Sequence, residues 1–295
     1  MDSIVYKLDT PVNHESIKQK SRELIESSKK EMSVENLKLI MSLIDLTTLS
    51  VTDNEERVKK MCEKVEVFQD VFSDIPNVAA ICVYPSLISV VGSTISNPNF
   101  GIASVGAGFP ASQTFPEIKS REVQLAVENG ANEIDVVLSV GEFLAGKFDA
   151  VYDEIVALKN ASGMAKLKVI LETGALPDYD AVRKASIIAM AAGADFIKTS
   201  TGKIDPAATP EAFLVMVKAI SDFYKETKKS IGIKPAGGIS NAEDALVYFN
   251  IVKKVLGNDW LNSKLFRIGA SRLTNNLLDK IHELSGIENP NRSYF

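Results

Sequence analysis

Two lysines stand where short apolar runs give way to glycines and hydroxyls, a setting in which an amine can do chemistry. Lys198 lies in DFIKTSTGKID, and Lys234 lies in IGIKPAGG. Burying an unpaired ammonium is costly, so such a lysine needs a partner, a lowered pKa or a chemical role. A neutral lysine amine can attack a carbonyl and form a Schiff base, and this is the chemistry that the two positions indicate.

Two aspartates in predicted strands could serve these amines. Asp45 lies in IDLTTL, and Asp135 lies in EIDVV. A carboxylate can stabilise the charged form of a lysine and can move protons. The candidate catalytic residues are therefore Lys198, Lys234, Asp135 and Asp45. The alternative is a buried ion-pair network without activity, but two lysines and two acids at strand ends favour chemistry.

The elements that must position these residues recur with a clear rhythm. Eight β-branched runs, each followed by an amphipathic helical pattern, begin at Ile44, Val78, Ile102, Glu133, Leu167, Phe196, Ile231 and Leu265. Strands that alternate with helices indicate parallel βαβ units, and eight units over roughly 230 residues match an α/β fold of the (β/α)8 TIM-barrel type. An open doubly wound sheet is the alternative; it more often carries a GxGxxG turn, which this sequence lacks.

Strand alternation predicts which way the lysines face. Phe196, Lys198 and Ser200 share one face of their strand, and in a barrel one face points to the interior. A lysine on the other face would be buried among apolar helix contacts, so we expect Lys198 and Lys234 inside the barrel. Their strands are neighbours, so the amines should lie close together. Desolvation and a second ammonium both push the pKa of a lysine down.

The loops after the seventh and eighth strands predict an anion site. Gly237 and Gly238 in PAGG let backbone N–H groups approach a ligand, and GASR precedes a helix that begins near Thr274. Lys203 and Arg272 could add positive charge. Because this corner of a barrel commonly binds phosphate, the two loops indicate a phosphorylated small molecule.

Bulk composition limits the class of protein. The chain has 295 residues, 45% hydrophobic and 24% charged, with a formal net charge of −5. The acidic balance argues against a nucleic-acid or membrane-surface partner. Two cysteines, no expected signal peptide and no apolar run of bilayer length predict a cytoplasmic protein. Two distant histidines argue against an imidazole metal site.

Seven segments resemble the deoxyribose-phosphate aldolase family of class I, Schiff-base aldolases. They occur in the family's order between residues 44 and 280: IDLTTL, AAICVYP, EIDVV, KVILETG, ADFIKTSTGK, IGIKPAGG and FRIGAS. The segment around VNHESI is similar to the longer, eukaryotic-type members. The resemblance implies reversible cleavage of 2-deoxy-D-ribose 5-phosphate to acetaldehyde and D-glyceraldehyde 3-phosphate, in deoxyribonucleotide catabolism, with no metal or organic cofactor.

The resemblance also implies roles for individual residues. It places the Schiff base on Lys198, a second catalytic lysine at Lys234, the proton-shuttling acid at Asp135 and a supporting acid at Asp45. The expected substrate and phosphate contacts, which include Gly237 and Arg272 from the loop argument, are Thr47, Thr201, Lys203, Gly237, Gly238, Gly269, Ser271 and Arg272. Arg272 stands where relatives often carry Ser or Thr, and a guanidinium can grip phosphate bidentately. Tyr294 is penultimate, whereas the family's tail often ends in tyrosine.

The expected domain organisation has three parts. Residues 1–42 form a charged N-terminal helical extension, 43–285 form the TIM-barrel aldolase domain, and 286–295 form a C-terminal tail. The extension could mediate contacts with partners or cover the barrel, and a homodimer or homo-oligomer stays open.

Two alternative functions are a Schiff-base aldolase for another phosphorylated aldose and a barrel that serves as a protein-interaction module. Loss of a catalytic residue would favour the second, and none is lost.

Overall fold

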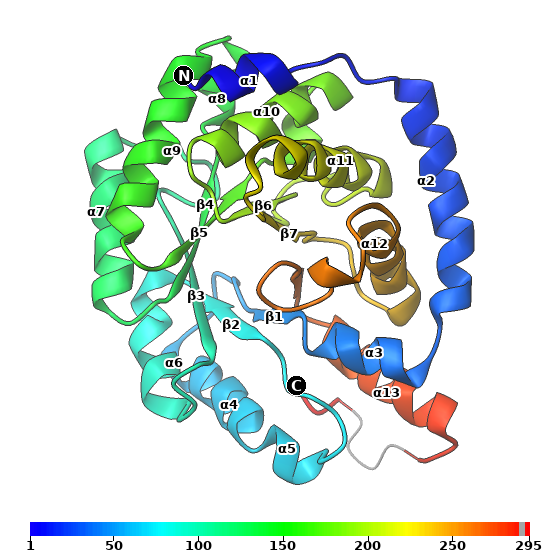
Figure 1. The fold of residues 1–295 in the computed structure, drawn as a ribbon. Coiled ribbons are helices and arrows are strands. Elements are labelled where there is room, and N and C mark those ends of the chain that lie inside the picture. Colours follow the sequence, from blue (N-terminus) through cyan, green and yellow to red (C-terminus); the bar gives the residue numbers. More distant parts are fainter. Residues whose placement is uncertain (289–292) are drawn as a thin grey trace.

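A closed ring of parallel strands forms the centre of the protein. The computed structural model describes residues 1–288 and 293–295. Within them, the strands are β1 (Ile44–Thr47), β2 (Ala80–Val83), β3 (Gly101–Gly106), β4 (Glu133–Val137), β5 (Lys166–Ile170), β6 (Phe196–Lys198), β7 (Gly232–Lys234) and β8 (Ile268–Ala270). They pair in the order β7-β6-β5-β4-β3-β2-β1-β8, and two parallel bridges, Ile233–Phe266 and Ala236–Gly269, join the ends. The predicted TIM barrel is confirmed (Figure 1).

Helices surround the ring in the alternation that the sequence predicts. They are α4 (Glu55–Glu66), α5 (Phe68–Val71), α6 (Ile88–Thr94), α7 (Pro116–Glu128), α8 (Val140–Leu144), α9 (Phe148–Ser162), α10 (Tyr179–Ala191), α11 (Pro210–Thr227), α12 (Ala242–Val255) and α13 (Leu273–Ser285). Short 3-10 helices lie at η1 (Lys29–Glu31), η2 (Pro85–Leu87), η3 (Thr173–Ala175) and η4 (Asn258–Trp260). Side-chain caps fix several starts; Asn54, for example, accepts a hydrogen bond from the N–H of Arg57. Within the described ranges, no helix has the length and apolarity to cross a membrane.

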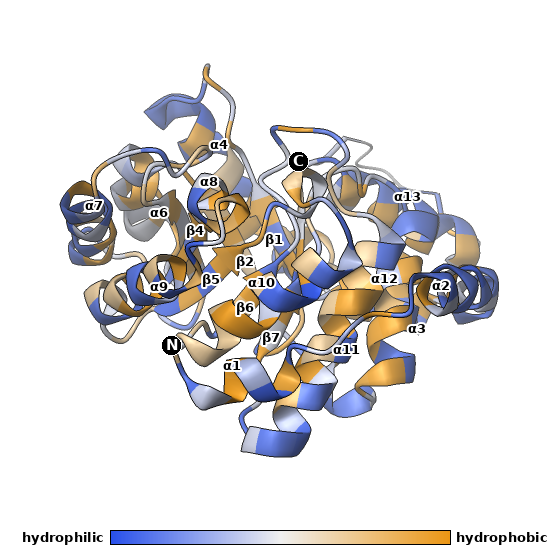
Figure 2. Ribbon diagram, turned by 90° about the horizontal axis from the view of Figure 1, so that it is seen from above, coloured by the Kyte–Doolittle hydropathy of each residue, from blue (hydrophilic) through white to orange (hydrophobic). Residues whose placement is uncertain are grey.

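Three N-terminal helices lie against the barrel. They are α1 (Ser3–Leu8), α2 (His14–Ser28) and α3 (Val34–Met41). Helix α2 packs against α11 and α12, and α1 packs against α10 and α11. Figure 2 shows α2 as largely hydrophilic beside the more hydrophobic α11 and α12. Because α2 covers their outer side, α11 and α12 can be apolar around most of their circumference.

The last residues of the chain dock beside α4 and α5. Of the tail expected at 286–295, residues 289–292 lie outside the described part. Tyr294 packs edge-on against Phe68 and Phe72, with ring centroids 5.7 and 5.2 Å away, and its hydroxyl donates to the carbonyl of Lys64 at 2.7 Å. Phe295 stacks on Phe68 at 5.6 Å. The two terminal aromatic residues therefore join the end of the chain to the helix that follows β1.

We expect Tyr294→Ala to lower the free energy of unfolding by about 1–3 kcal/mol, because the variant loses aromatic contacts and a hydrogen bond. Urea denaturation measures this change. Tyr6→Ala is the matched control, since Tyr6 is 68% exposed. Equal unfolding free energies for the two variants would show that the docked tail does not stabilise the fold.

Candidate active site

A cavity of about 470 Å³ opens at the C-terminal ends of β1, β6, β7 and β8. Its wall includes Lys198 and all of the predicted substrate and phosphate contacts, which are Thr47, Thr201, Lys203, Gly237, Gly238, Gly269, Ser271 and Arg272. The wall also includes residues that the sequence analysis did not select, among them Ser50, Arg57 and Ser240. The carboxyl ends of the strands thus gather the predicted binding residues into one space, as expected for a TIM barrel.

Lys198 joins this cavity to the barrel interior. It ends β6 and pairs in register with Lys234 of β7. Its side chain is only 3% exposed, and its Nζ lies 2.8 Å from Oδ2 of Asp135. The amine is therefore almost dry, yet it borders a space that a small molecule could enter.

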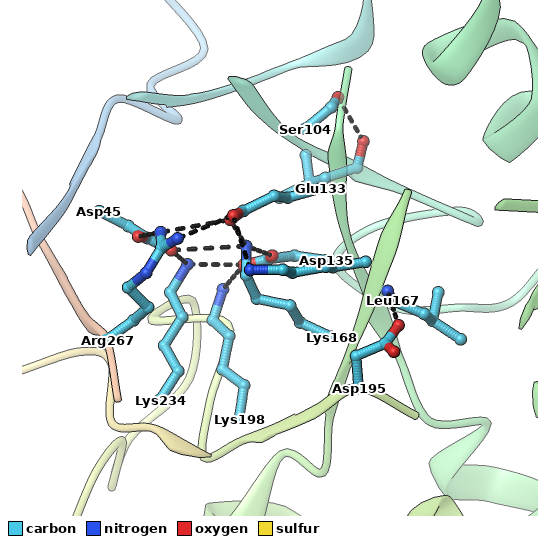
Figure 3. Close-up of polar contacts among 12 residues, drawn as sticks. Asp45, Ser104, Glu133, Asp135, Leu167, Lys168, Asp195, Lys198, Lys234 and Arg267 are labelled. Carbon is cyan, nitrogen blue, oxygen red and sulfur yellow. Dashed lines mark hydrogen bonds and ion pairs between the residues drawn. The ribbon is translucent and has the colours of Figure 1, made fainter. Parts of the chain in front are cut away.

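The other three candidate catalytic residues lie beside Lys198 and are fully buried. Lys234 Nζ lies 2.6 Å from Oδ2 of Asp45 and 2.8 Å from Oδ2 of Asp135. One oxygen of Asp135 thus faces both lysines (Figure 3). The predicted proximity of the four side chains is present in the structure, because β1, β4, β6 and β7 all direct them into the barrel.

Three more buried charged residues belong to the network, and the sequence analysis missed them; the partly exposed Lys166 borders it, 3.9 Å from Glu133. Lys168 lies 2.6 Å from Glu133 and 3.0 Å from Asp135, and Arg267 lies 2.8 Å from Glu133 and also bonds Asp45. A sequence signal was present. Glu133 precedes Asp135 by two residues, and Arg267 precedes Gly269 by two, so strand alternation places each pair on the same interior face.

Charge balance sets Lys198 apart from the other cations of the network. The three carboxylates of Asp45, Glu133 and Asp135 are matched by Lys168, Lys234 and Arg267. An ammonium on Lys198 is an additional charge in a dry interior. Burial lowers the pKa of Lys198 from its ordinary 10.5; Asp135 opposes this shift, and Lys234 adds to it.

Lys234 corrects the expectation that burial and a like-charged neighbour would push either lysine toward neutrality. Burial does favour its neutral form, but the carboxylates of Asp135 and Asp45 outweigh burial and raise the pKa of Lys234. Burial acts on Asp135 too, yet Lys168, Lys198 and Lys234 hold the pKa of its carboxyl well below the usual range. The site therefore contains one amine with a lowered pKa beside an ammonium and a carboxylate.

The loop after β6 is held in place by Glu172, a residue with a strained backbone conformation. Glu172 follows β5 with a left-handed φ of 52°, and it accepts hydrogen bonds from the N–H and the hydroxyl of Thr201. The Thr201 hydroxyl also accepts from the N–H of Lys203 at 3.0 Å. The ammonium of Lys203 donates to the carbonyl of Leu49. These contacts fix the position of Lys203 at the cavity wall.

A side chain would be strained or crowded at two glycines of the cavity wall. Gly237 has a φ of +85°, and a Cβ there would lie 2.6 Å from the Cβ of Ala207. A Cβ at Gly269 would lie 3.0 Å from Cε of Lys234. The glycine at 269 thus leaves room for the side chain of Lys234, and the glycine at 237 shapes the loop. Ser271 and Arg272 follow β8 and lead directly into α13.

Tyr294 does not contribute to the cavity wall. Its hydroxyl bonds Lys64 near the C-terminal end of α4, whereas Arg57 in the first turn of the same helix lines the cavity. The tail tyrosine is therefore bound away from Lys198.

Comparisons with known proteins agree with this geometry. Residues 39–250 match the model of the DeoC/LacD aldolase family. The chain is 42% identical over 288 residues to a human protein named deoxyribose-phosphate aldolase, covering 93% of this chain and 91% of that protein. A mouse protein of the same name is 40% identical, with the same coverage.

Solved structures give the same result at lower identity. An aldolase called QR15 superposes with a TM-score of 0.67 at 26% identity, covering 83% of this chain and 98% of its own. A deoxyribose phosphate aldolase from Aeropyrum pernix, described as a tetramer, gives 0.67 at 25% identity and covers 88% and 97%. By sequence and by fold, this chain belongs to the DeoC/LacD aldolase family and is a carbon–carbon lyase.

Proposed function

We propose that the chain cleaves 2-deoxy-D-ribose 5-phosphate reversibly to acetaldehyde and D-glyceraldehyde 3-phosphate through an imine on Lys198. The observation that carries this proposal is the nearly buried, unbalanced amine of Lys198 at the cavity wall. The names of the human and mouse relatives support the choice of substrate. We propose a role for this reaction in deoxyribonucleotide catabolism, and a cytoplasmic location stays a prediction. That the chain forms a homodimer or homo-oligomer stays a prediction.

The first half of the reaction forms the electron sink. The neutral amine of Lys198 attacks the C1 aldehyde of the open-chain sugar and gives a carbinolamine. Loss of one water then gives a protonated imine. The nearby ammonium of Lys234, whose pKa is raised although burial opposes it, can donate a proton to the departing hydroxyl.

The second half of the reaction breaks the C2–C3 bond and restores the free amine of Lys198. A base removes the proton of the C3 hydroxyl, the C2–C3 electron pair moves toward the iminium nitrogen, and glyceraldehyde 3-phosphate leaves. The base is a water activated by Asp135 and Lys234; the Asp135 carboxyl stays ionised beside three lysines and can receive the proton. Protonation of the enamine at C2 and addition of one water release acetaldehyde and restore the amine. General acid–base help of this kind contributes about 10²–10⁴-fold.

The far half of the cavity suits the phosphate. Lys203 and Arg272 supply positive charge, and the glycine loop after β7 exposes backbone to a ligand. Among the described residues that line the cavity, none is Asp or Glu. A cavity with this lining, in a chain whose net charge is −5, attracts an anionic substrate locally.

We expect sodium borohydride to trap 2-deoxyribose 5-phosphate on Lys198, because reduction of an imine gives a stable secondary amine. Peptide mapping by mass spectrometry locates the adduct. Lys198→Leu should reduce turnover to background while the circular dichroism spectrum is unchanged. Lys225→Leu, on an exposed part of α11, is the control. An adduct on another lysine would disprove the assignment.

The pH dependence should report the charge balance. Only neutral Lys198 attacks, so kcat/KM should rise with pH up to the pKa of Lys198, which burial lowers below 10.5. Lys168→Met removes one of the cations that balance the carboxylates, so an ammonium on Lys198 becomes more favourable. The pKa at which kcat/KM rises on the acid side of the profile should therefore increase by about 1 pH unit or more. Lys168→Arg keeps the charge and should preserve the profile. An unchanged pH profile of kcat/KM in Lys168→Met would contradict the proposed charge balance around Lys198.

Phosphate recognition should depend on Arg272. We expect Arg272→Ser to raise KM for the phosphorylated sugar about tenfold with a small change in kcat, since a charge-assisted contact is lost. Steady-state kinetics with 2-deoxyribose 5-phosphate and with unphosphorylated 2-deoxyribose measure this. If KM rises equally for both sugars in the variant, Arg272 does not bind the phosphate.

Faster cleavage of another phosphorylated aldose by the wild-type chain would instead indicate a related aldolase.

A further inference from the structure

One wall of the active-site cavity has no role in the reaction proposed above. It consists of Thr48, Leu49 and Ser50, in the loop after β1, together with Arg57 in the first turn of α4. Because β1 pairs with β8, this loop is the neighbour of the β8 loop that carries Ser271 and Arg272. Arg57, at the start of α4, and Arg272, just after β8, therefore line the same cavity from segments that follow neighbouring strands.

Arg57 is held in place although its side chain is 57% exposed. Its Nε lies 3.5 Å from Asp53, a carboxylate with 1% exposure, and its Nη1 donates to the hydroxyl of Thr52 at 3.3 Å. Asp53 also accepts from the hydroxyl of Thr48 and the N–H of Ser50, so the same carboxylate shapes the wall and holds the guanidinium. The Nη2 of Arg57 makes no hydrogen bond to any residue in the described ranges.

The other cations that line the cavity leave part of a bound phosphate without a cationic partner. The described residues supply four cationic side chains to the lining, which are Arg57, Lys198, Lys203 and Arg272. Lys198 is reserved for the aldehyde, at the opposite end of the substrate from its phosphate. Lys203 already donates to the carbonyl of Leu49. A phosphate dianion has three terminal oxygens, more than one guanidinium fork can satisfy.

We infer that Arg57 is a second guanidinium ligand of the substrate phosphate and sets the preference for phosphorylated over unphosphorylated sugars. This inference rests on the proposed function. The phosphate lies between Arg57 from the β1 loop and Arg272 from the β8 loop. Asp53 pairs with Nε of Arg57 and Thr52 accepts from Nη1, so Nη2 is the group presented to the anion.

The test compares Arg57→Leu with Lys60→Leu. Both variants remove one positive charge from α4, but Lys60 pairs with Glu56 on the exposed side of the helix and does not line the cavity. The measured quantity is the ratio of kcat/KM for 2-deoxyribose 5-phosphate to that for 2-deoxyribose. We expect this ratio to fall about three- to tenfold in Arg57→Leu and to stay unchanged in Lys60→Leu. Arg57→Lys, which keeps the charge, should recover part of the loss.

A binding measurement separates this inference from the proposed function. Calorimetric titration of the wild-type chain and the variants with inorganic phosphate needs no turnover. Weaker phosphate binding in Arg57→Leu than in Lys60→Leu would support Arg57 even if the sugar phosphate were not cleaved. Equal phosphate affinity and an equal specificity ratio in the two variants would overturn the inference, because Arg57 would then act only through its distant charge.

Discussion

The buried ion-pair network inside the barrel has four cations and three carboxylates, and the chemistry of the site depends on this imbalance. Asp45, Glu133 and Asp135 are each bonded to cations other than Lys198. Desolvation makes a surplus charge expensive in such a place, whereas each balanced pair keeps its charges. This single feature of the fold thus lowers the pKa of one amine and leaves an ammonium and a carboxylate beside it.

The barrel architecture makes this arrangement possible because it brings distant residues onto one inward face. Alternate residues of the strands supply successive layers of side chains, so Phe196 lies below Lys198 on β6. A Cβ at Gly232 would meet the Phe196 ring at 2.3–2.5 Å, so the neighbouring strand needs a glycine there. Gly269 leaves similar room for Lys234. The small residues of β7 and β8 are therefore part of the site, although they carry no functional group.

Much of this could be predicted from the sequence, because strand periodicity and strand ends are local signals. The positions of Lys198 and Lys234 inside the barrel followed from alternation, and Asp45 and Asp135 followed as the acids of predicted strands that could serve them. The role of Lys168 did not, because it depends on partners from two strands at once: β4, its direct neighbour in the sheet, and β1, which only the closed ring brings within reach. The raised pKa of Lys234 has the same origin: a count of neighbouring lysines predicts its direction wrongly when two carboxylates lie closer. The docking of Tyr294 depends on long-range aromatic packing, for which a tail sequence gives no periodic signal.

The most direct test of the central claim is the titration of Lys198 itself. In a chain with 15N-labelled lysine side chains, the Nζ signal that disappears in Lys198→Met can be followed by NMR from neutral to alkaline pH. The charge imbalance predicts that this amine loses its proton at a lower pH than the ordinary lysine value of about 10.4, while Lys234 and Lys168 stay protonated beyond it. An ammonium on Lys198 that persists to about pH 10 or above, like an exposed lysine, would contradict it.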